Sequence, residues 1–123
     1  MYHGIIIDQE FVDKNFPKTF KIFAKKQDGD WGIYGIEIEN SQLQLTIKNI
    51  QEKMKGDSPW YAHFYNDNQL IVIFKNKVFT IMSEKKSWQP VIDYGKLLNI
   101  PIEQLDFFPN NFKNETNYFK PKL

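Results

Sequence analysis

The feature that most constrains this fold is residues 70–74, a run of five apolar residues with no polar position. Successive side chains of a β-strand point to opposite faces of the sheet, so a strand of this kind is buried on both faces. Ile5, Ile6 and Ile7 form a second run without a polar face. Both segments therefore predict strands in the interior of a sheet that is covered on both sides.

A β-hairpin is predicted to precede the run at 70–74. Its arms, 19–26 and 31–39, flank Asp28-Gly29, and this dipeptide favours a tight turn because glycine adopts positive φ without steric cost. Apolar and polar residues alternate along the second arm, which is typical of a half-buried strand. A three-stranded meander with asparagine in its turns is predicted for residues 60–66, 70–75 and 78–83.

An amphipathic helix is predicted between the hairpin and the meander. The sequence Ser-Gln-Leu-Gln from Ser41 matches a capping box, in which the serine hydroxyl and the glutamine amide satisfy backbone N–H groups. Apolar residues recur at helical spacing from Leu43 to Met54 and form one continuous stripe. We therefore expect a helix over residues 41–55 that ends at Gly56.

A second helix is expected after the meander. It is predicted to begin at Ser87, to carry Pro90 in its first turn and to stop at Asn99. A short further turn is predicted at residues 102–107. The element order β-β-β-α-β-β-β-α indicates an α+β fold: a two-layer sandwich in which both main helices pack on one face of a mostly antiparallel sheet of about six strands.

The chain of 123 residues has the length of a single domain. We assign that domain to residues 1–109 and expect the polar C-terminal tail, 110–123, to be extended or poorly ordered. Two helices on one face leave the other face of the sheet bare. Residues 9–19, the tail or another subunit would then have to cover it.

Composition narrows the classes of function. The chain has no cysteine, which excludes disulfides, cysteine-based zinc sites and cysteine nucleophiles. The first apolar stretch stops at Asp8, so neither a signal peptide nor a membrane span is expected, and we predict a soluble cytoplasmic protein. All 16 basic residues are lysine, against 15 acidic residues. The lack of arginine and the near-zero net charge argue against a dedicated nucleic-acid binder.

The first candidate site is centred on His63. Tyr61 and Tyr65 flank it at strand spacing, so the three side chains share one face of a predicted strand. A histidine between phenols can act as an acid or base or can orient a polar ligand, and Tyr34 is a fourth candidate ligand-binding residue. The alternative is an ordinary strand face near water, because the sequence fixes no nucleophile or carboxylate beside His63. No catalytic residue and no cofactor is predicted.

Asp8, Glu10 and Asp13 form a second candidate cluster just after the first strand. Carboxylates in such a place can bind Mg²⁺ or Ca²⁺ through their oxygens. Solvated loop acids, with Asp8 as an N-cap, are the favoured interpretation, because the tight, glycine-containing register of a calcium loop is absent. We therefore predict no metal site.

Residues 91–105 have the spacing of a helix-turn-helix motif, but Glu103 and Asp106 in the second helix would repel phosphates, so DNA binding there is rejected. Lysines near aromatic residues could track single-stranded nucleic acid, and they also protect edge strands from aggregation. These lysines are Lys21, Lys25, Lys26, Lys75, Lys77, Lys85 and Lys86.

Three functions follow as hypotheses. The preferred one is a small non-enzymatic binding or regulatory module that acts through protein–protein contacts, including self-association as a homodimer, because apolar and aromatic residues exceed what two short helices can cover. The first alternative is a small-molecule binder or enzyme with a pocket around Tyr61, His63 and Tyr65. The second alternative is a weak binder of single-stranded nucleic acid.

Overall fold

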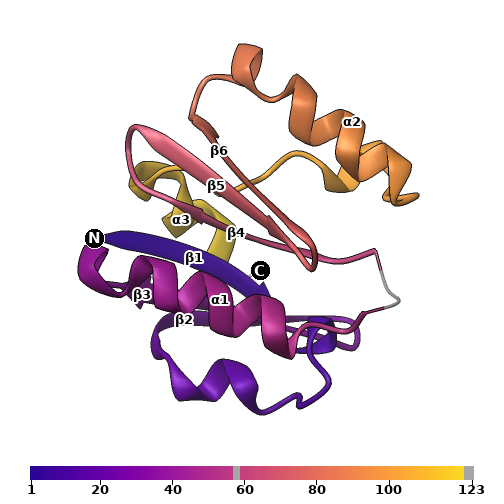
Figure 1. Cartoon of the computed structure of the whole chain (residues 1–123). Coiled ribbons are helices and arrows are strands. Elements are labelled where there is room, and N and C mark those ends of the chain that lie inside the picture. The colour runs from indigo at the N-terminus through magenta and orange to yellow at the C-terminus, as the bar shows by residue number, and fades with distance from the viewer. Residues whose placement is uncertain (57–58, 121–123) are drawn as a thin grey trace.

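The protein forms a six-stranded antiparallel sheet in a computed structural model that describes residues 1–56 and 59–120 (Figure 1). The spatial order of the strands is β2-β3-β1-β4-β5-β6. Strands β1 and β5 both lie in the interior, as their apolar runs predict. The six strands are β1 Tyr2–Ile7, β2 Lys21–Asp28, β3 Trp31–Ile38, β4 Tyr61–Tyr65, β5 Gln69–Phe74 and β6 Lys77–Met82.

Three helices, α1 Leu43–Lys53, α2 Gln89–Leu97 and α3 Phe112–Phe119, complete the α+β fold. The predicted element order is confirmed, and α3 follows as an additional element. In the described parts of the chain, no helix is long and apolar enough to cross a membrane. Short 3₁₀ turns lie at Asp8–Glu10, Phe16–Thr19, Asn40–Gln42, Lys85–Ser87 and Ile102–Gln104.

The predicted N-caps of the first two helices are wrong. Ser41 lies inside the 3₁₀ turn Asn40–Gln42, and α1 begins after it without a side-chain cap. Ser87 likewise ends a 3₁₀ turn, and its hydroxyl accepts a hydrogen bond from the backbone N–H of Met82 at 3.2 Å. In both cases a 3₁₀ turn precedes the α-helix, and the serine predicted as the N-cap lies in that turn.

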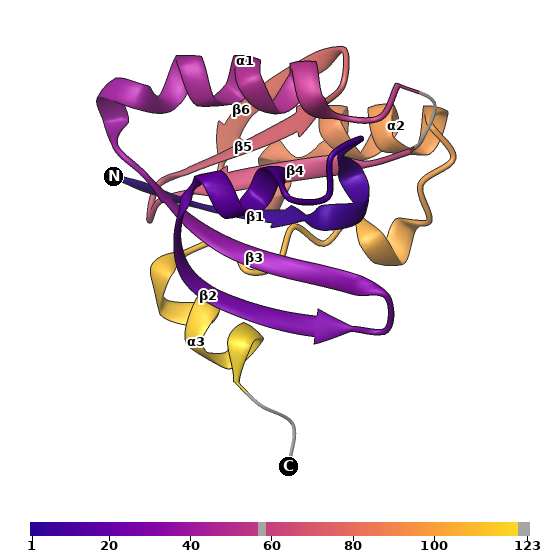
Figure 2. The same ribbon diagram turned by 90° about the horizontal axis from the view of Figure 1, so that it is seen from below.

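The placement of both helices on one face is also wrong, because α1 and α2 cover opposite faces of the sheet. Helix α1 packs on a first core, to which β5 contributes Ile71 and Ile73. Helix α2 packs on a second core, to which β5 contributes Leu70, Val72 and Phe74. A strand that is apolar on both faces is stabilised when each face has its own cover. Figure 2 shows α1 and α3 on opposite sides of the sheet.

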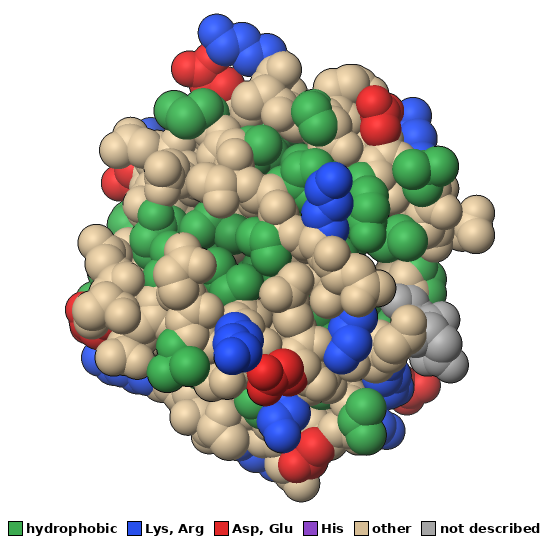
Figure 3. Space-filling model, viewed as in Figure 1, with side chains coloured by type: hydrophobic (Ala, Val, Ile, Leu, Met, Phe, Trp, Pro, Cys, Tyr) green, Lys and Arg blue, Asp and Glu red, His purple; other side chains and the backbone are tan. Residues whose placement is uncertain are grey.

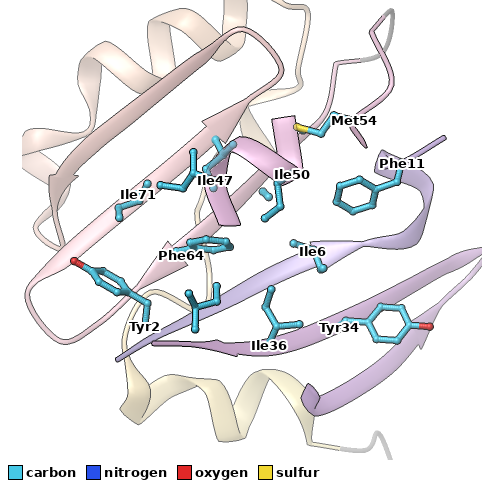
Figure 4. Packing of buried hydrophobic residues seen from close by; sticks show 13 residues of the cluster. Tyr2, Ile6, Phe11, Tyr34, Ile36, Ile47, Ile50, Met54, Phe64 and Ile71 are labelled. Carbon is cyan, nitrogen blue, oxygen red and sulfur yellow. The ribbon is translucent and has the colours of Figure 1, made fainter. Parts of the chain in front are cut away.

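The first core is built around the apolar stripe of α1. Figure 4 shows Ile47 and Ile50 of α1 directed toward the sheet, near Phe64 and Ile71. The ring of Phe64 lies so close to Gly4 of β1 that a Cβ atom there would be 2.3 Å from Phe64 Cδ1. The central strand therefore needs glycine at this position to let an aromatic side chain pack across it.

The expectation of an extended or poorly ordered tail is wrong for α3. Asn111 caps this helix by accepting a hydrogen bond from the N–H of Asn114 at 2.9 Å, and aromatic residues of the helix pack on the second core. Glu115 fixes it to the sheet by hydrogen bonds with His3 Nδ1 at 2.8 Å and from Tyr65 Oη at 2.5 Å. Residues 121–123 of the predicted tail lie outside the described residues.

Candidate functional site

Strand β4 places three of the four predicted site residues on one face of the sheet. Tyr61, His63 and Tyr65 alternate with Ala62 and Phe64, which belong to the first core. The ring centroid of His63 lies 6.1 Å from that of Tyr61 and 5.9 Å from that of Tyr65. The grouping expected from strand periodicity is present, and its role in ligand binding stays a prediction.

Tyr34 does not join this group. It lies on β3, its side chain is buried in the first core, and that core is on the opposite face. The reason is the register: Tyr34 is directly opposite Ile6 of β1, and residues opposite each other in neighbouring strands share a face. Since Ile6 faces the first core, Tyr34 does so too.

His63 is buried and neutral. Its Nε2 lies 2.8 Å from the carbonyl oxygen of Pro109, and because a carbonyl can only accept, Nε2 carries the proton. Burial lowers the pKa of His63 from its ordinary value to about 4, while the hydrogen bond to Pro109 and the charge of Asp106 act in the opposite direction. Its neighbour Tyr61 donates its hydroxyl to the carbonyl oxygen of Gln104, and burial raises its pKa.

Beside His63 the central sheet opens. The ladder between β1 and β4 ends at the pair Ile5–His63, although β1 continues to Ile7 and β4 begins at Tyr61. On its other side β1 stays paired with β3 up to Ile7–Ile33. Pairing between the two strands is therefore lost over the last residues of β1 and the first residues of β4, and residues of both strands line a cavity of about 290 Å³.

Aromatic side chains form the walls of this cavity. Trp31 and Trp60 meet edge to face with ring centroids 5.3 Å apart. Phe108 and Tyr118 form a second edge-to-face pair at 5.7 Å, and Tyr61 completes the set. Burial raises the pKa of Tyr118 to about 12, so its phenol is neutral at physiological pH. The volume lies at the lower end of the range for small-molecule sites, which are typically several hundred cubic ångströms.

Glu10 is a lining residue of the cavity whose carboxyl group is buried. The 3₁₀ turn Asp8–Glu10 folds its side chain back, so that Oε1 accepts a hydrogen bond from the N–H of Ile7 at 2.8 Å. Oε2 is buried and has no hydrogen-bond partner among the described residues, and the side chain as a whole is 0% exposed. Burial raises the pKa of Glu10 well above its ordinary value; the bond from Ile7 opposes this rise and the charge of Asp8 adds to it.

The backbone holds Glu10 in place from the other side. Its carbonyl oxygen accepts a hydrogen bond from the N–H of Lys55 at 2.8 Å, just beyond the end of α1. Phe11, the next residue, forms an isolated β-bridge with Met54 and is fully buried in the first core. The carboxyl group is thus positioned by two elements far apart in the sequence, β1 and the segment after α1.

Three exposed acids complete the lining of the cavity. They are Asp28 from β2 and Glu103 and Asp106 from the loop after α2. With Glu10 the lining carries four carboxyl groups, and no lysine is among the described residues that line it. The charged side chains of the lining are therefore all acidic.

The second predicted cluster is divided by the structure. Asp13 is an exposed loop acid whose Oδ1 accepts from the N–H of Asn15, as the solvated interpretation predicts. Asp8 is not an N-cap; its Oδ1 accepts from the N–H of Gly32 at 3.0 Å. The interpretation as a solvated loop acid is wrong for Glu10, which is buried. Within residues 1–56 and 59–120 no three His, Asp or Glu side chains converge as a metal site requires.

Sequence reasoning missed the residues that shape the cavity. It singled out Tyr61 and His63, whose alternation is a local signal, but not Trp31, Trp60 or Tyr118, which come from three distant segments. The only available signal was the density of aromatic residues near strand ends, and such residues are equally common in cores.

Comparison with known proteins gives no match. No protein-family model, no curated protein and no solved structure matches this chain. Function is therefore argued from the chemistry of the cavity itself.

Proposed function

We propose that this protein binds a small organic molecule in the cavity between the ends of β1 and β4. The observation that carries the proposal is the Oε2 atom of Glu10, which is buried, has no partner among the described residues and belongs to a residue that lines the cavity. An unpartnered buried polar atom costs about 1–3 kcal/mol. A ligand that donates a hydrogen bond to Oε2 would remove this cost, and the surrounding rings would contribute apolar contact area.

Binding is better supported than catalysis. The Nε2 atom of His63 is already engaged by Pro109, and a histidine with a pKa near 4 is a weak base at neutral pH. The hydroxyl of Tyr61 is engaged by Gln104, and its raised pKa keeps it protonated. These side chains are suited to orient a ligand and not to transfer its protons.

Protein–protein contact stays a prediction with less support than it had from the sequence. It rested on a bare sheet face, and each face now has its own helix and core. A groove between α1 and the β5–β6 hairpin remains, where Figure 3 shows apolar side chains gathered at the surface. Polar side chains such as Gln44, Lys48 and Gln51 share its lining. Homodimer formation, a cytoplasmic location and weak binding of single-stranded nucleic acid likewise stay predictions.

The proposal is tested by a fragment screen with two-dimensional NMR on the ¹⁵N-labelled protein. Fragments that bind in the cavity are expected to shift the amide signals of β4 and of the turn at Asp8–Glu10. Ile7→Phe should weaken these fragments, because Ile7 lines the cavity and a larger ring would fill it.

The matched control is Ile81→Phe. Ile81 is also a half-buried isoleucine on a strand, packs against the same second core and is not part of the cavity lining. Its substitution should leave fragment binding unchanged. The proposal is wrong if no fragment shifts the cavity signals, or if both variants affect binding equally.

A further inference from the structure

The charge of the cavity restricts the class of ligand. Its lining has four carboxyl groups from three different segments and no lysine among the described residues, in a chain whose acidic and basic residues are nearly equal in number. An anionic ligand would meet unfavourable charge from Asp28, Glu103, Asp106 and Glu10, and the positive charge of Lys26 lies close to the lining, with its Nζ 3.6 Å from the centroid of the Tyr118 ring. The lining favours a cation or a neutral molecule.

The aromatic walls favour an organic cation over a neutral molecule. Trp31, Trp60, Tyr61, Phe108 and Tyr118 surround the space from four segments of the chain. The face of an aromatic ring is electronegative, and several rings around one space attract an alkylated ammonium group through cation–π interactions. The same rings supply apolar contact for the carbon atoms attached to the nitrogen.

Glu10 identifies the part of the ligand that must lie beside its carboxyl group. Its Oε2 is the unpartnered oxygen and accepts a hydrogen bond once the carboxyl group is ionised, whereas Oε1 is occupied by the N–H of Ile7. An N–H group of a protonated amine both fills the vacant hydrogen bond and compensates the charge of the carboxylate. A quaternary ammonium group has no N–H and cannot make this bond.

We infer that the ligand is a protonated organic amine, whose N–H group donates to Oε2 of Glu10 and whose alkyl part lies between the Trp31–Trp60 and Phe108–Tyr118 ring pairs. This inference rests on the proposed function and assigns its ligand class. In the empty cavity a retained proton neutralises the carboxyl group of Glu10. A positive charge beside Oε2 favours the ionised carboxylate, so the bound ammonium group compensates this charge in place of the proton.

The test compares four probes of one shape: cyclohexylammonium, N,N,N-trimethylcyclohexylammonium, cyclohexanol and cyclohexanecarboxylate. Dissociation constants are measured by NMR titration of the full chain. Cyclohexylammonium is expected to bind at least about tenfold more tightly than cyclohexanol, because a charge-assisted bond replaces a neutral one. The trimethylated cation should bind more weakly than cyclohexylammonium, and the carboxylate should not bind.

Two variants separate the role of Glu10 from net charge. Glu10→Gln keeps an oxygen for the N–H of Ile7 and removes the charge, so it should lower the affinity for cyclohexylammonium at least about tenfold and that for cyclohexanol far less. Asp13→Asn removes the same charge from an exposed acid three residues away that is not part of the lining, and it should leave both affinities unchanged.

The outcomes distinguish the inference from the proposed function. If cyclohexanol binds as tightly as cyclohexylammonium or more tightly, the amine assignment is overturned. In that case, loss of cyclohexanol binding in Ile7→Phe would still support a small-molecule site. An unchanged affinity of Glu10→Gln for cyclohexylammonium also overturns the assignment. If Glu10→Gln fails to fold, the ranking of the four probes by the unaltered protein decides. If none of the four binds, the assignment is wrong, and the fragment screen alone judges the proposed function.

Discussion

Replacing His63 by glutamine should remove a specific part of the acid sensitivity of the fold. His63 is buried with Nε2 against the carbonyl of Pro109, and burial lowers its pKa to about 4. In the unfolded chain the same imidazole titrates near its ordinary value of about 6.5. Between these two values the unfolded state binds a proton that the folded state does not. Stability contributed by His63 is therefore present above about pH 6.5 and is lost as the pH falls toward 4.

The size of the effect follows from the two pKa values. A separation of about 2.5 units corresponds to about 3 kcal/mol when the whole interval is crossed. Between about pH 7 and pH 5, where only part of the interval is crossed, the expected loss is about 2 kcal/mol. Glu10 acts with the opposite sign, because its raised pKa stabilises the folded state at low pH and that contribution is lost as the pH rises.

The measurement is urea unfolding of the unaltered protein and of His63→Gln at both pH values, followed by tryptophan fluorescence. Glutamine can still donate to the Pro109 carbonyl but does not titrate. Contributions of other groups, Glu10 included, cancel in the difference between the two proteins. That difference in unfolding free energy should change by about 2 kcal/mol in favour of the variant as the pH falls from 7 to 5. A difference that is independent of pH would refute the argument that His63 is buried in its neutral form.

Four further substitutions, one of them a control, test the packing of the fold. Ile50→Ala, in the first core, should lower the unfolding free energy by about 3 kcal/mol. Leu45→Ala, on the exposed side of the same helix, should change it by less than about 0.5 kcal/mol. Equal effects of the two substitutions would contradict the assignment of the buried face of α1. Gly4→Ala should cost about 1–3 kcal/mol because its Cβ would overlap the ring of Phe64, and a neutral effect would contradict that contact. Glu115→Gln should weaken the attachment of α3 by about 2 kcal/mol and accelerate hydrogen exchange in that helix more than in β5. An equal acceleration in both elements would contradict the attachment of α3 through Glu115.

The strands were predictable from the sequence because strand patterns are local. The apolar run at 70–74 needs no knowledge of its neighbours to indicate an interior strand, and β5 lies there. Gly29 has a φ of 58° in the β2–β3 turn, as the Asp-Gly dipeptide predicts. No local sequence pattern shows which face of the sheet each helix covers. The apolar stripe of α1 would pack equally well on either face, and the strand order decides which face is reached.

The candidate site shows the same division. Tyr61 and His63 could be placed together because two positions on one strand share a face. Glu10 could not be distinguished from Asp13, since both are acids in one polar segment after β1 and no local pattern separates them. Their difference arises from the backbone contact between Glu10 and Lys55, which joins residues forty-five positions apart and turns one acid inward.

The position of the cavity also explains why a buried acid is tolerated there. Where β1 separates from β4 beyond Ile5, backbone groups lose their ladder partners, and the side chain of Glu10 supplies an acceptor for the N–H of Ile7. Only Oε1 is needed for that task, and an amide or a hydroxyl would serve as well without the cost of a buried acid. A domain of this size is stabilised by only about 5–15 kcal/mol, so an unpartnered carboxyl oxygen is a considerable fraction of the total. The bond from the N–H of Ile7 accounts for one oxygen of Glu10, and the ligand that we propose would account for the other.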